Sequence, residues 1–195
     1  MIQLTKMFRN ASLQTKGIFT ILSLAGYFIS SHFLEKSYVL SKFPVPYFEQ
    51  QTSFDAVKMK EWYAFMINEG TFDIYLTTQF IDFTFIATVI LAGYTLWALI
   101  AQLHPEHSFF NRWGEKLAYA LPLAGLFDIL ENIVSFFMIA NPENFADSLV
   151  LPYSLFAVLK FGCWTVGLIW LLPSIITLLV NLLRPKRIST QWVNE

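Results

Sequence analysis

Four long apolar segments dominate this chain of 195 residues and limit its possible folds more than any other feature. A straight helix crosses a bilayer with about 20 apolar residues, so each segment is long enough for one membrane span. Only 14% of the residues are charged, against about 25% in soluble domains. We therefore predict an all-α fold, an integral membrane four-helix bundle in which residues 1–195 form a single membrane domain. The predicted spans are residues 17–34, 76–103, 117–140 and 149–183.

The start of the chain also resembles a signal peptide, because Lys6, Arg9 and Lys16 precede the first apolar segment. That segment ends in Ile29-Ser30-Ser31-His32, which lacks the small-residue pattern of a cleavage site. We therefore expect an uncleaved first span. The mixed residues 1–16 suit a short helix on the membrane face.

Residues 35–74 are expected to lie outside the membrane. Lys42-Phe43-Pro44-Val45-Pro46 predicts an extended start, because each proline disfavours helix at the residue before it. Thr52 with Asp55 resembles a helix capping box, and Gly70 suits the end of that helix. We predict an external amphipathic helix between spans 1 and 2 that packs on the bundle or in the headgroup layer, as a lid or as a substrate gate. Its apolar side is expected to include Phe54, Val57, Trp62 and Met66.

Lysine and arginine are unequally divided between the segments that connect the spans. Eight lie before the first span, in residues 104–116 and after the last span, and four lie in residues 35–74. Because short cytoplasmic loops carry an excess of these residues, we expect both termini to be cytoplasmic and residues 35–74 to be external.

Ionisable side chains interrupt three of the spans: Asp82 in the second, Asp128 and Glu131 in the third, and Lys160 in the fourth. With the predicted topology all four fall within about two helical turns of one depth, in the outer half of the bilayer. In hydrocarbon each charge needs a partner, a proton or water, so we expect them to face one another. Lys160 is the only cation at this depth for three carboxylates. Protons, a bound cation or a cationic ligand group must therefore offset the excess negative charge.

Three further side chains are placed to join these four. Asn132 and Gln79 can both donate and accept hydrogen bonds, and Trp164 follows Lys160 by one helical turn. Gln79 and Asp82 belong to a single helix face that ends in Gly93, which permits close helix contact. The candidate polar pocket therefore consists of Asp82, Asp128, Glu131, Asn132, Lys160, Gln79 and Trp164.

The run Asp128-Ile129-Leu130-Glu131-Asn132 is a D-x-x-E-N motif, and Tyr75, Asp82 and Phe85 form a Y-x6-D-x-x-F pattern. With Lys160 early in the fourth span, the chain resembles a family of uncharacterised bacterial four-span membrane proteins. The resemblance covers roughly residues 50–170 and implies the same bundle and polar cluster, in a bacterial inner membrane, without implying a reaction. Where the family often continues F-P-x-x-Y, this chain has Ile86 and Val89.

Several functions suit such a cluster. It can be a structural network that fixes helix register, a ligand, ion or proton site, or an acid–base pair acting on a lipid. The leading hypothesis is a protein that binds a lipid-like membrane molecule, or an accessory or assembly subunit that joins another membrane protein or a second copy. The alternatives are a lipid-modifying enzyme that uses Asp82, Asp128 and Glu131, and an oligomeric proton- or cation-coupled transporter.

Other classes are disfavoured by composition. A net charge of −1 gives no argument for a nucleic-acid partner. The single Cys163 excludes an internal disulfide and a two-cysteine redox motif. None of His32, His104 and His107 is predicted at the depth of the carboxylates, so zinc is a poor fit. We predict no metal site and no cofactor, although oxygen ligands alone can suit Ca²⁺ or Mg²⁺.

Overall fold

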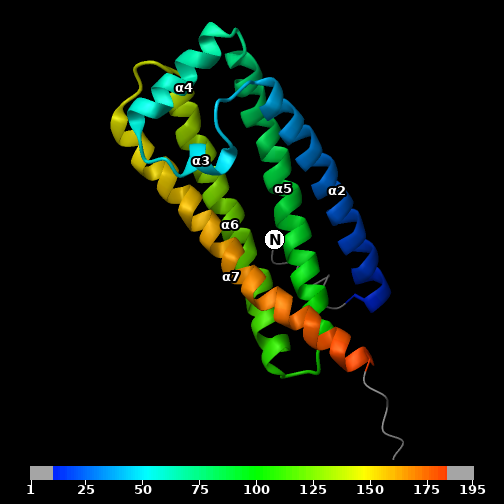
Figure 1. Cartoon of the computed structure of the whole chain (residues 1–195). Helices are drawn as coiled ribbons and strands as arrows, with labels where there is room; N and C mark the ends of the chain where they lie inside the picture. The colour runs from blue at the N-terminus through cyan, green and yellow to red at the C-terminus, as the bar shows by residue number, and fades with distance from the viewer. Residues whose placement is uncertain (1–10, 184–195) are drawn as a thin grey trace, which may run out of the picture.

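The computed structural model describes residues 11–183, and within them every regular element is helical. The four long helices are α2 (Leu13–Leu40), α5 (Phe72–Leu103), α6 (Phe109–Ile139) and α7 (Val150–Leu183), and all four are long and apolar enough to cross a membrane (Figure 1). Two shorter helices, α3 (Tyr47–Gln51) and α4 (Ala56–Asn68), connect α2 to α5, and a 3-10 turn, η1 (Asp147–Leu149), leads into α7. The all-α prediction is confirmed, and each predicted span coincides with one helix that is long and apolar enough to cross a membrane. The predictions for residues 1–10 and 184–195 lie outside the described residues.

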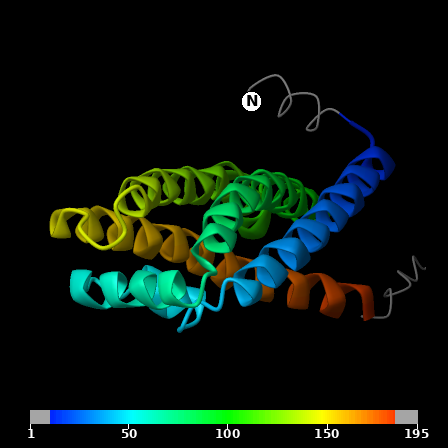
Figure 2. The ribbon, with the colours of Figure 1, turned by 90° about the horizontal axis from the view of Figure 1, so that it is seen from above.

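The long helices pack in chain order, α2 on α5, α5 on α6 and α6 on α7. Along the described residues α2 does not pack against α7, and from above the two run at an angle to each other (Figure 2). The arrangement is therefore open on one side, where part of α5 faces the space between α2 and α7.

Three of the long helices begin before their predicted spans, at Leu13, Phe72 and Phe109, and α2 also continues to Leu40, because hydropathy marks the apolar stretch and not the hydrogen-bonded turns at its ends. The clearest difference lies at residues 109–116, which we expected to belong to the segment that connects the second and third spans. They are the first two turns of α6, which Ser108 caps by accepting a hydrogen bond from the backbone N–H of Asn111.

The segment between α2 and α5 also differs from the prediction. The capping residue of α4 is Asp55, whose carboxylate accepts from the N–H groups of Val57 and Lys58, so the expected cap at Thr52 is wrong. Because α4 begins after Asp55, its buried face consists of Met59, Tyr63 and Met66. Phe54 and Val57, which we expected on that face, are exposed. The extra helical turn, α3, was not predicted.

Two apolar cores occupy opposite ends of the molecule. At the α4 end, residues of α4 pack with the ends of the long helices. At the other end, tryptophans and alanines of α5, α6 and α7 pack together. The first core includes Met59, Tyr63, Tyr75, Met138 and Tyr153, and the second includes Trp97, Ala101, Ala118, Leu121 and Trp170. The polar side chains predicted to cluster lie between these two cores.

The contact between α2 and α5 is made by paired hydroxyls. Ser23, Ser30 and Ser37 are seven residues apart on α2 and pair with Thr95, Thr88 and Thr78 of α5 at 2.7, 2.6 and 2.7 Å. Lys16 and Gln102 extend this series toward the start of α2. A seven-residue repeat keeps one helix face against its partner, so the series fixes the register of α2 on α5.

Candidate functional site

A buried lysine joins α6 to α7 at the centre of the site. The Nζ atom of Lys160 lies 2.8 Å from Asp128 Oδ1 and 2.6 Å from Glu131 Oε2, and all three side chains are buried. The two acids are three residues apart, which places them on one face of α6. Charge-assisted hydrogen bonds of this kind are about twice as strong as neutral ones, so the group ties the two helices together.

Asp82 joins the group through a neighbour and not through the lysine. Asn132 Nδ2 donates to Asp82 Oδ2 at 2.7 Å, and both residues are buried. Because Asn132 follows Glu131 directly, α5, α6 and α7 meet at one level. We call Asp82, Asp128, Glu131, Asn132 and Lys160 the ionic cluster.

The remaining two predicted residues lie on either side of this cluster. Gln79 is buried on α5 but is not among the residues that line the adjoining cavity. Trp164 does line it, one turn along α7 from Lys160, with its ring 6.1 Å from that of Trp97. A Cβ atom at Gly93 would lie 3.3 Å from the Trp164 ring, so the glycine lets α5 and α7 approach as predicted.

The unpredicted helix α3 supplies a further cluster residue. Gln51 is buried, and its Oε1 accepts from Lys160 Nζ at 3.3 Å. On the same helix, Tyr47 stacks on Tyr38 of α2 with 3.6 Å between ring centroids, and Phe48 lies 5.3 Å from Phe161 of α7. Thus α3 bridges α2 and α7 across the open side. Five residues are too few to show helical periodicity, so the sequence carries little signal for it.

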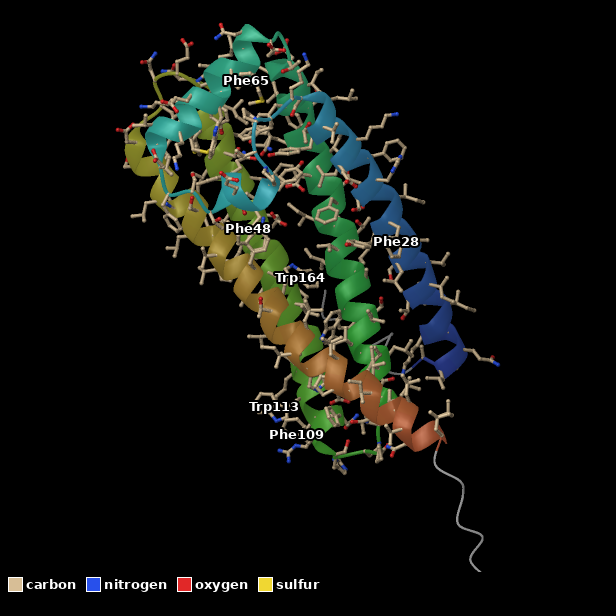
Figure 3. The ribbon with its side chains drawn as sticks, viewed as in Figure 1. Phe28, Phe48, Phe65, Phe109, Trp113 and Trp164 are labelled. Atoms are coloured by element: carbon tan, nitrogen blue, oxygen red, sulfur yellow. The ribbon has the colours of Figure 1, made fainter. Side chains whose placement is uncertain are left out.

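A cavity of about 770 Å³ lies between α2 and α7, over α5 and next to α3. Phe48 and Trp164 mark positions along it in Figure 3. At the α3 end its wall includes the carboxyl groups of Glu35, Asp82 and Asp128 together with Lys160 and Gln51. Toward the other end the wall is apolar, with Val89, Ala92, Leu96, Trp97 and Trp164. The cavity is therefore polar at one end and apolar at the other.

Among the described residues, the buried oxygens without a hydrogen-bond partner include the Tyr47 hydroxyl, Glu131 Oε1 and, one turn further along α6, Ser135 Oγ. Tyr47 also lines the cavity. Burial first, and then the carboxylate of Asp82, raise the pKa of Tyr47, so its hydroxyl keeps its proton and can donate it in a hydrogen bond. A buried polar group without a partner lowers stability, so this hydroxyl is available to bind a ligand, either by donating its proton or by accepting on its oxygen.

The fold and the site together describe an all-helical protein. It has four helices long and apolar enough to cross a membrane and an ionic cluster beside a cavity. Comparisons with models of protein families, with curated proteins and with solved structures give no match. Among the described residues, no three His, Cys, Asp or Glu side chains are placed together as metal ligands. The acids of the cluster are instead arranged around Lys160 and Asn132.

Proposed function

We propose that this chain is an integral membrane protein that binds a lipid-like amphiphile in the cavity between α2 and α7. The observation that carries the proposal is the change of polarity along the cavity, from the carboxyl groups near α3 to the paired tryptophans Trp97 and Trp164. A molecule with a polar head and an apolar body matches this wall. The volume of about 770 Å³ lies in the usual range for small-molecule sites, about 300–1,000 Å³.

The position of the cavity supports access from the bilayer. It lies where α2 and α7 do not pack together, along two helices whose outer faces carry exposed apolar side chains. Phe28 on α2 and Ile169 on α7 are 65% and 67% exposed. In a membrane these side chains would contact lipid tails, so an amphiphile would reach the site sideways without crossing water.

We also infer that the α3–α4 end faces outward, with both termini in the cytoplasm of a bacterial cell and α4 as an external amphipathic helix. The excess of Lys and Arg in the segments on the other side supports this orientation. We also propose that the chain is related to the bacterial four-span family that it resembles, whose D-x-x-E-N motif here lies in the ionic cluster. Each polar residue of the D-x-x-E-N motif has a partner, since Asp128 and Glu131 bind Lys160 and Asn132 binds Asp82.

Native mass spectrometry of the purified protein tests amphiphile binding. The wild type is expected to retain an amphiphile, and Ala92→Phe is expected to lose it, because Ala92 lies on the apolar part of the cavity wall and is buried. Ala87→Phe is the matched control, since it adds the same ring to an exposed position of α5 outside the wall. Equal retention by the two variants, or no retained amphiphile in any of the three proteins, would contradict the proposal.

One observation favours a second candidate, a lipid-modifying enzyme. Asp82 lines the cavity and is bound by Asn132 and not by Lys160, so it is the carboxylate best placed to exchange a proton with a bound molecule. Asp82→Asn would then abolish turnover of a bound lipid while leaving the lipid in place. Among the described residues nothing comparable favours the accessory-subunit, self-association or transporter hypotheses.

A further inference from the structure

Building on the proposed amphiphile-binding function, we infer that the cavity selects amphiphiles whose head is an ammonium group and discriminates against anionic heads. The inference rests on the hydrogen-bond capacity and charge of the wall at the α3 end. The change of polarity along the cavity indicates an amphiphile, whereas the charge and hydrogen-bond capacity of the wall indicate which head group the amphiphile carries.

Lys160, the one ammonium group that the described residues contribute to the cavity wall, has no donor to spare. A lysine side chain has three N–H donors, and Lys160 has three acceptors, Asp128 Oδ1 at 2.8 Å, Glu131 Oε2 at 2.6 Å and Gln51 Oε1 at 3.3 Å. A phosphate or carboxylate head would have to displace one of them. Displacing either carboxylate would leave a buried acid without its cation, which is strongly destabilising. The site therefore lacks a free cation for an anionic head.

The carboxyl groups, in contrast, have unused acceptors. Asp82 is bound only through Oδ2 and Asp128 only through Oδ1, so within the described residues Asp82 Oδ1 and Asp128 Oδ2 accept no hydrogen bond. Both side chains line the cavity and are more than nine-tenths buried, at 8% and 5% exposure. Glu35 adds a third, exposed carboxyl group to the rim. The wall thus carries three carboxyl groups and a single ammonium group, that of Lys160, which is already paired. This charge balance favours a cationic ligand.

Aromatic rings surround the same end of the cavity. Tyr27 and Tyr38 of α2, Tyr47 of α3 and Phe85 of α5 all line it, and the Tyr27 and Phe85 rings lie 5.7 Å apart. The faces of such rings attract ammonium ions, and cages of them recognise quaternary ammonium ligands. Negative carboxyl oxygens and aromatic rings on one wall are a combination that suits an alkylammonium head. Its alkyl chain would extend along Ala92 and Leu96 toward Trp164.

The test compares three ligands that share a ten-carbon chain: decylammonium, decanol and decanoate, each added below its aggregation limit to detergent-purified protein at pH 7. Tryptophan fluorescence reports binding because Trp97 and Trp164 lie on the wall. We expect decylammonium to bind about tenfold more tightly than decanol, and decanoate more weakly than either. Decyltrimethylammonium, which has no titrating proton, is expected to behave like decylammonium.

Substitutions of single carboxyl groups test which of them cause the preference for decylammonium over decanol. Asp82→Asn and, separately, Glu35→Gln should each reduce the advantage of decylammonium over decanol, measured as the ratio of their two dissociation constants. Asp73→Asn removes the same charge from an exposed position of α5 outside the cavity wall and should retain the full advantage. Glu35 is exposed, so its variant keeps the test usable if Asp82→Asn does not fold.

The outcomes separate the two proposals. If decanol binds as tightly as decylammonium, or decanoate binds more tightly, the head-group inference is wrong while amphiphile binding stands, provided that Ala92→Phe abolishes the signal. An equal loss of the ammonium preference in Asp73→Asn and the two cavity variants would also overturn the inference, because a general surface charge would then explain it. If none of the three ligands binds, the amphiphile-binding proposal fails as well.

Discussion

The contact of α2 with α5 and the contact of α6 with α7 both place polar side chains between apolar helices, but with opposite chemistry. Between α2 and α5 the polar groups are neutral hydroxyls. In the pair of Ser30 and Thr88 one hydroxyl donates to the other, and each also lies within hydrogen-bond distance of a carbonyl of its own helix, that of Tyr27 or Phe85, to which it can donate instead. Between α6 and α7 they are ions that depend on one another, with Lys160 as the shared partner. Hydroxyl pairs can therefore lose a member at little cost, whereas the ionic cluster cannot.

The largest expected effect is on the ionic side. Lys160→Met leaves Asp128 and Glu131 buried without a cation and should lower the free energy of unfolding by about 3–5 kcal/mol. Thermal unfolding in detergent measures the loss, with Lys58→Met, at an exposed position of α4, as the control. Adding Asp128→Asn and Glu131→Gln to Lys160→Met should recover much of the stability. A single variant as stable as the control would show that the three charges do not depend on one another.

A smaller loss is expected where α3 contacts the cluster. Gln51→Ala removes one acceptor from Lys160, and a hydrogen bond to a charged group contributes about 1.5–3 kcal/mol. The matched control is Glu49→Ala, an exposed position of the same helix. Both variants are compared by thermal unfolding in the same detergent. Indistinguishable midpoints would mean that α3 packs on the cluster without stabilising it.

The hydroxyl pairs should respond more weakly. Ser30→Ala removes one partner of Thr88, which still donates to the Phe85 carbonyl, so we expect a loss of about 0.6 kcal/mol. A double-mutant cycle with Thr88→Val measures the coupling between the two hydroxyls. A coupling energy as large as the loss in Lys160→Met would remove the contrast between the two contacts.

The smallest expected effect depends on pH and lies at the end of α5. Burial lowers the pKa of His104, whose Nε2 lies 2.7 Å from Ser174 Oγ. Because the folded state holds this imidazole neutral more strongly than the unfolded state does, its contribution to stability is present above about pH 6.5 and is lost as the pH falls through the lowered pKa. The unfolding midpoint of the wild type should therefore fall more between pH 7 and pH 5 than that of His104→Gln. His107→Gln, at an exposed position, should follow the wild type, and parallel profiles for wild type and His104→Gln would refute the assignment.

The parts of the structure that the sequence could predict are those with a strong local pattern. The length of the apolar segments identifies the four helices, and the predicted α5 face from Tyr75 to Gly93 is buried throughout. The meeting of Asp128 and Glu131 with Lys160 is the geometry expected when charges must find partners in an apolar bundle.

Other features have no such pattern. A side chain that faces lipid and one that faces an apolar cavity are chemically alike, so the sequence could not show that α2 and α7 stand apart or that Ala92 and Trp164 share a cavity wall. The position of Gln51 depends on a single helical turn held by aromatic contacts at both sides. The seven-residue spacing of Ser23, Ser30 and Ser37 is visible in the sequence, but hydroxyl residues on one helix do not identify the helix that they face.

The placement of Lys160 on the last helix has a consequence for the order of synthesis. The chain is made from its N-terminus, so Asp128 and Glu131 of α6 are synthesised before Lys160 of α7, the cation that pairs with them. A chain that stops before α7 holds both acids without Lys160 and presents them to any quality-control machinery that recognises unpaired charge in a membrane. The two ion pairs can therefore form only after Lys160 of α7 has been made.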